Sequence, residues 1–168
     1  MLGDLLDINK IIVDYFKNPE ATPMPRVIVW IGSNDEAKEV LAKALAKKAN
    51  VKLYIWNPID FFKASPEVVE REVERVVKEK KAILYIKDAE FLIPNIEMMP
   101  KEMVEDKGEL IALIAAFVIK CILTACEGGV PVILDVIDKD YILSYVLEEL
   151  ADLKVNVDWA ELPVEDVK

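Results

Sequence analysis

Apolar and polar residues follow two alternating patterns along this chain. Five short apolar runs, at residues 27–31, 51–56, 82–86, 130–137 and 153–157, predict buried β-strands. Helical periodicity of apolar positions predicts helices at 2–17, 37–46, 66–78, 109–126 and 143–150. Nearly continuous apolar strands that alternate with helices are typical of a parallel sheet covered on both faces. We therefore expect an α/β fold, a three-layer α/β/α sandwich around a five-stranded, mainly parallel sheet.

The loop after the first predicted strand carries the most informative local sequence. It has the length of a phosphate-binding P-loop, G-x-x-x-x-G-K-[ST], and reads Gly32, Ser33, Asn34, Asp35, Glu36, Ala37, Lys38, Glu39. The first glycine and the lysine of that motif are present. Ala37 stands at its second glycine, and Glu39 at its hydroxyl residue.

Three stretches together resemble the large nucleotide-binding subdomain of AAA+ ATPases. Residues 41–46, LAKALA, resemble the sequence that follows the Walker A threonine in that family. Residues 82–90 resemble the Walker B strand, and residues 132–140 resemble the sensor-1 strand. The resemblance implies the strand order 5-1-4-3-2 and a single domain over residues 1–168. Within it, residues 1–25 form an N-terminal helix and proline linker, and no helical lid is expected.

The same resemblance places unsuitable residues at the family's functional positions. Lys87 falls where a Mg²⁺-coordinating aspartate is expected, Asp88 where the catalytic glutamate is expected, and Ile137 where the polar sensor is expected. A shift of one residue would bring Asp88 to the metal position. Asp88 is the one weak catalytic candidate, and we expect no meaningful ATP hydrolysis, no metal site and no cofactor, with ATP and Mg²⁺ binding at most weakly.

Acidic residues crowd the start of the helix that would receive the phosphate. One like-charge pair at ~5 Å costs roughly 3 kcal/mol at an effective dielectric constant of ~20. In the first turn, Asp35, Glu36 and Glu39 instead gain ~0.3–1 kcal/mol each from the helix dipole. Ser33 or Asn34 can cap the helix, and Glu36 can complete a capping box with Ser33. This pattern favours an ordinary helix start with a solvated or ion-paired Lys38.

Composition narrows the possible partners. The formal net charge of −10 and the pI of about 4.6 argue against nucleic acid as a partner. Abundant Glu and Lys, with no His, resemble the composition of hyperthermophile proteins.

Cys121 and Cys126 point to different sides of one predicted helix, so we expect two buried thiols and no disulfide between them. No signal peptide is visible, and the cytoplasm is the expected location. Glu90 and Glu97 are expected to be surface acids.

The helix at 109–126 is apolar around almost its whole circumference. We expect its stripe of Leu110, Leu113, Ile114, Phe117 and Cys121 to fill the core. An adjacent stripe then needs another cover; its residues are Ile111, Ala115, Val118 and Ile122, with Ala125. The N-terminal helix is one candidate cover. We expect a protein partner or a second copy to cover the stripe at least in part, because the resemblance gives the N-terminal helix its own place beside the first strand. Lys120 lies inside the apolar run, so we do not expect a membrane span.

Three functions remain open from the sequence. The first is a non-hydrolysing AAA+-like domain that serves as a scaffold or regulatory protein-interaction subunit. The second is a weak ATP-binding protein or slow ATPase that uses Lys38. The third is an unrelated doubly wound domain, for instance receiver-like, that binds a small molecule at its strand ends.

Overall fold

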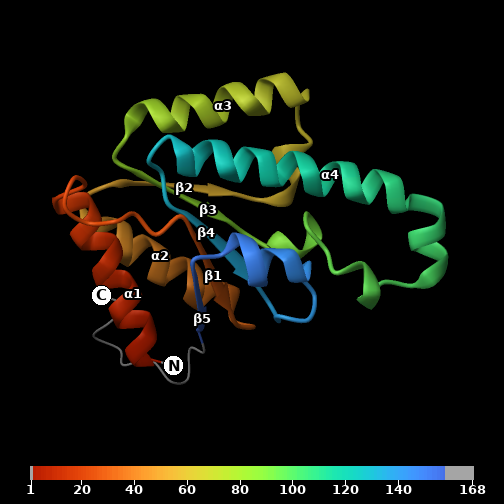
Figure 1. Cartoon of the computed structure of the whole chain (residues 1–168), viewed down its shortest axis with the longest axis horizontal. Coiled ribbons are helices and arrows are strands. Elements are labelled where there is room, and N and C mark those ends of the chain that lie inside the picture. The colour runs from red at the N-terminus through yellow and green to blue at the C-terminus, as the bar shows by residue number, and fades with distance from the viewer. Residues whose placement is uncertain (1, 158–168) are drawn as a thin grey trace.

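A computed structural model describes residues 2–157 and shows an α/β fold in three layers (Figure 1). Helices α1 (Leu2–Lys17) and α2 (Asp35–Ala49) cover one face of the sheet. Helices α3 (Pro66–Glu79) and α4 (Lys101–Glu127) cover the other face. Each face has its own hydrophobic cluster of buried residues, as expected for a sheet whose strands are apolar on both sides.

Five parallel strands form the sheet in the order β2-β3-β4-β1-β5. The strands are β1 (Val27–Ile31), β2 (Lys52–Trp56), β3 (Ala82–Ile86), β4 (Val132–Val136) and β5 (Leu153–Asn156). Counted from β5, the order is 5-1-4-3-2. β3 and β4 separate β2 from β1, so the receiver-like arrangement, with β2 beside β1, is wrong.

Two helices differ from the prediction, one in length and one in type. α4 begins at Lys101 and has 27 residues, so it includes part of the methionine-containing segment expected to be a loop. Its N-terminal half projects beyond the strands (Figure 1). The helix predicted at 143–150 is present over residues 144–150, but it is π-helical over Val146–Leu150. In the turn before it, the Asp138 carboxylate accepts the Asp140 N–H (2.9 Å).

The stripe of α4 that faces the sheet most directly is the adjacent one and not the one expected. Ala115, Val118 and Ile122 are buried in the core of the same chain. Of the expected core stripe, Cys121 is buried and Ile114 and Phe117 are partly buried against the core, whereas Leu110 and Leu113 are 55% and 69% exposed. The predicted interface between chains at Ala115, Val118 and Ile122 is therefore wrong, and its fourth residue, Ile111, is half-buried beside a pocket of the same chain.

The exposed position of Lys120 agrees with this orientation of α4. Lys120 is exposed, and its Nζ donates to Glu70 on α3 (3.1 Å). Residues two positions away on a helix point to the opposite side, so an outward Lys120 turns Val118 and Ile122 toward the sheet. Cys121 and Cys126 are buried free thiols, as expected.

By length and composition α4 is apolar enough to cross a membrane. Core helices of soluble proteins pass the same test, and α4 places one face on the sheet of a small α/β domain. The arrangement is compatible with a soluble protein.

Candidate functional site

The link between β1 and α2 is too short to wrap around a phosphate. It consists of residues 32–34, and regular helix begins at Asp35. The Asn34 side chain accepts the Ala37 N–H (2.9 Å), and the Asn34 carbonyl accepts the Lys38 N–H (3.1 Å). A P-loop holds phosphate with free N–H groups at a helix start. Here these two N–H groups are bonded within the chain.

Asn34 is thus the helix cap, as one of the two alternatives predicted. Because the cap is not Ser33, the capping box expected between Ser33 and Glu36 is wrong. Both of these side chains are exposed at the start of α2.

Gly32, the first glycine of the P-loop-like motif, is explained by strand packing. A Cβ at this position would overlap the backbone carbonyl of Val157, just past the end of β5. The Val157 N–H donates to the Ile31 carbonyl (2.7 Å), and the Gly32 N–H donates to the Val136 carbonyl (3.0 Å). The close approach of these backbones requires glycine whether or not a phosphate binds.

Lys38 lies in the first turn of α2, and its side chain is fully buried. Its Nζ forms an ion pair with Asp135 on β4 and lies 3.3 Å from Oδ1 of Asp35. It also donates to the carbonyls of Gly32 (2.5 Å) and Val136 (3.3 Å). These four oxygens surround the Lys38 ammonium group, so its N–H donors are already used within the chain. Lys38 is ion-paired, as one of the sequence alternatives stated, but it is not solvated.

Asp135 is the residue of this candidate site that the sequence interpretation missed. It is fully buried on β4, and its strand neighbour in register is Trp30 on β1. Burial raises the pKa of Asp135, and the Lys38 ammonium opposes that rise. Burial and the nearby Asp135 carboxylate also raise the pKa of Tyr85. The available signal was a lone charge in the apolar run of residues 130–137, because a charged residue in a central strand needs a buried partner.

Three carboxylates converge around this ammonium group. Oxygens of Asp35, Asp88 and Asp135 all lie within 4.8 Å of one another. Three carboxylates at this spacing are able to share one hard cation. The Lys38 ammonium already binds two of them, so a divalent ion would have to displace it or bind against its charge.

The two residues at the positions where the AAA+ resemblance would expect Mg²⁺ ligands bind each other. Lys87, directly after β3, donates to Oε2 of Glu39 on α2 (3.3 Å). Glu39 also lies 3.6 Å from Lys43 on the next turn. The charges of Lys87 and Glu39 therefore cancel at the position where the resemblance would put a metal ion.

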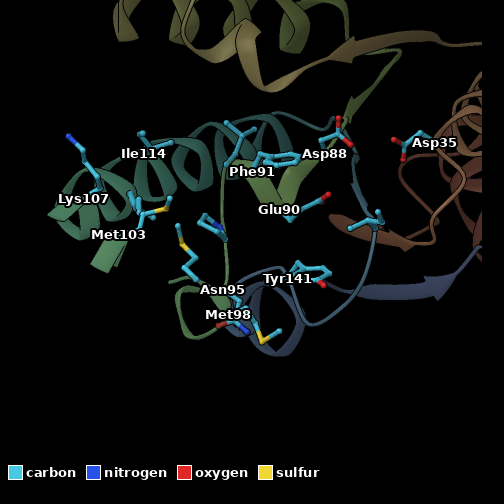
Figure 2. Close-up of a pocket in the computed structure, with 15 residues that line it drawn as sticks. Asp35, Asp88, Glu90, Phe91, Asn95, Met98, Met103, Lys107, Ile114 and Tyr141 are labelled. Carbon is cyan, nitrogen blue, oxygen red and sulfur yellow. The ribbon is translucent and has the colours of Figure 1, made fainter. Parts of the chain in front are cut away.

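Asp88 follows Lys87 and has a left-handed backbone (φ 51°), which Asp tolerates better than most residues. Burial and the neighbouring Asp35 raise the pKa of Asp88. Figure 2 shows its carboxylate near Asp35, at one end of a pocket.

Glu90 corrects the expectation of a surface acid. Its side chain lies inside this pocket, only 8% of the residue is exposed, and burial raises its pKa to about 7. Its Oε2 has no hydrogen-bond partner among the described residues. Glu97 is exposed, as expected.

The pocket has a volume of about 800 Å³ and lies beside the cluster of carboxylates. The segment after β3, the projecting half of α4 and the loop after β4 surround it (Figure 2). Ile137, at the expected sensor position, is one of its lining residues.

Fold and site together define an α/β protein with a parallel sheet, a buried ion pair at the carboxyl ends of its central strands and an adjoining pocket. No protein-family model matches the sequence, and no curated protein matches it.

Proposed function

We propose that this chain is a non-hydrolysing AAA+-like domain that acts as a scaffold or regulatory protein-interaction subunit. The observation that carries the proposal is the fully buried Lys38, whose ammonium is held by Asp135 and by backbone carbonyls. The strand order 5-1-4-3-2 supports the AAA+-like part. The closed lysine site supports the absence of turnover.

The energetic argument follows from the contacts of Lys38. A phosphate that recruited this ammonium would leave Asp135 buried without its partner. Breaking a buried ion pair in that way costs about 3–5 kcal/mol, which is two to three decades or more in affinity. The bonded N–H groups of Ala37 and Lys38 offer little in return.

The alternative of a slow ATPase that uses Lys38 also lacks a place for Mg²⁺. Glu39 and Lys87, which stand at the two expected ligand positions, form an ion pair. Asp88 lies near Asp35 at one end of the pocket and is the remaining candidate for a metal ligand (Figure 2). We therefore rank this alternative second.

The test is a titration with ATP and Mg²⁺, read by thermal unfolding and by phosphate release. We expect no saturable stabilisation and turnover well below ~1 s⁻¹, the lower end of the usual kinase range. The control variants are Lys38→Ala and Lys43→Ala, since Lys43 is an exposed lysine on the same helix. Stabilisation by ATP that Lys38→Ala abolishes and Lys43→Ala retains would overturn the proposal in favour of the slow ATPase.

The outer face of α4 supports the interaction role. Leu110 and Leu113 are exposed on the projecting part of this helix. Apolar side chains clustered at a surface are typical of protein contacts. We propose that a protein partner or a second copy covers them, in the cytoplasm and without nucleic acid or membrane. Sedimentation of the purified protein with Leu113→Glu as the probe distinguishes self-association from a monomer that awaits another protein.

A further inference from the structure

The pocket beside the closed lysine site combines an apolar body with an acidic end. Its volume of about 800 Å³ lies within the usual range for small-molecule sites. Met98, Met99 and Met103 line it together with Ile111 and Ile114 of α4. Methionine side chains adapt to ligands of different shape. The pocket adjoins the carboxyl ends of β3 and β4, where open parallel sheets commonly bind ligands.

Acidic groups gather at one end of this pocket. Asp35, Asp88 and Glu90 line that end, whereas Lys107 lies at the far end and is exposed (Figure 2). Lys38 is not among the lining residues, and its ammonium lies against Asp135 and 3.3 Å from Oδ1 of Asp35. Asp88 and Glu90 therefore supply the negative charge that is available to a ligand at this end.

Glu90 is the second, independent sign of a ligand. Only 8% of this residue is exposed, and it lines the pocket. Its Oε2 has no hydrogen-bond partner among residues 2–157. A buried carboxylate oxygen is costly without a donor, and a donor that enters the pocket would supply one.

We propose that this pocket binds a small amphipathic organic cation, an amine carried on an aryl or alkyl body. The ammonium group donates to Glu90 and lies near Asp88, while the apolar body packs against the methionines and α4. An inorganic cation would leave the apolar walls unused, and a carboxylate or phosphate ligand would meet like charge at Asp88 and Glu90. The site does not depend on whether Lys38 accepts a phosphate.

Three probes of equal length and different charge test the proposal. They are 4-phenylbutylamine, 4-phenylbutanol and 4-phenylbutyrate, titrated into the full chain at pH 8 by calorimetry. At this pH the amine is charged, as a lysine side chain is. We expect the amine to bind at least ~10-fold more tightly than the alcohol because its hydrogen bond to Glu90 is charge-assisted. The carboxylate should bind most weakly.

Variants locate the binding. Glu90→Gln should weaken the amine at least ~10-fold and leave the alcohol unchanged, whereas Glu97→Gln, an exposed neighbour, should change neither. Met103→Ala should weaken the amine and the alcohol by similar factors, because it shortens the apolar wall. Circular dichroism verifies that each variant is folded.

Four outcomes would overturn the proposal: no binding of the amine at millimolar concentration, equal affinity for all three probes, preference for the carboxylate, or an amine affinity that Glu90→Gln leaves unchanged. The ATP titration is a separate measurement, so the nucleotide proposal and the ligand proposal fail independently.

Discussion

The buried ion pair between Lys38 and Asp135 makes a quantitative prediction. In the variant Lys38→Met, the Asp135 carboxylate stays fully buried and loses its ammonium partner. We expect the free energy of unfolding to fall by about 3–5 kcal/mol. A loss of that size is a large share of the ~5–15 kcal/mol typical of a domain.

The reverse change should cost less. In Asp135→Asn, the ammonium keeps Oδ1 of Asp35 at 3.3 Å and the carbonyls of Gly32 and Val136. The expected loss is about 2 kcal/mol, in the range for one buried polar partner removed. The double variant contains neither charge, so its loss should be smaller than the sum of the two single losses by ~1–3 kcal/mol.

Urea unfolding at pH 7, followed by circular dichroism, measures all four proteins of this double-mutant cycle. Lys43→Met is the matched control, because Lys43 is exposed on the same helix, and it should stay within ~0.5 kcal/mol of the original chain. Losses that add within ~0.5 kcal/mol, or a loss below ~1 kcal/mol for Lys38→Met, would refute the assignment of Lys38 as an internal partner of Asp135.

Further predictions concern the pocket, the β1 turn and α4. Glu90→Gln should stabilise the chain by about 2 kcal/mol at pH 8 and by little at pH 5, a Tm gain of ~4–8 °C at the higher pH, after discounting for water in the pocket. The folded-state pKa of Glu90 is raised, so the original chain loses stability, relative to the variant, as pH rises from about 4.5 through about 7. Gly32→Ala should cost more than ~2 kcal/mol, because its Cβ meets the backbone carbonyl just past the end of β5. Ile122→Glu should unfold the domain, whereas Leu113→Glu should retain the fold and alter only self-association or partner binding, since Ile122 is buried and Leu113 is exposed.

Each of these predictions has a contradicting result. If thermal unfolding shows the same stability gain from Glu90→Gln at pH 5 and at pH 8, the prediction for Glu90 is contradicted. Gly108→Ala, where a Cβ meets only ordinary contact, is the control for the glycine change. A Gly32→Ala protein as stable as that control would show that the approach of β5 does not restrict this position. A folded Ile122→Glu protein would contradict the burial of α4.

The sequence by itself determined the layered architecture. Continuous apolar strands that alternate with helices require a sheet covered on both sides, and local signals placed most of the strands within one or two residues. Asn34 as a possible cap and an ion-paired Lys38 were also within reach of the sequence, because both depend on the first turn of a single helix.

The tertiary structure decided which partners these residues meet. Asp135 reaches Lys38 only because β4 pairs with β1, and no local pattern specifies that pairing. An almost wholly apolar helix does not specify which side faces the sheet; in the structure Val118 and Ile122 face it, and Lys120 is exposed. Glu90 is buried in the pocket bounded by the projecting half of α4, so its environment depends on an element that follows it in the chain. Hydrophobic periodicity shows which residues of a segment must be buried. Whether a charged residue can be buried depends on the distant groups that the fold brings to it.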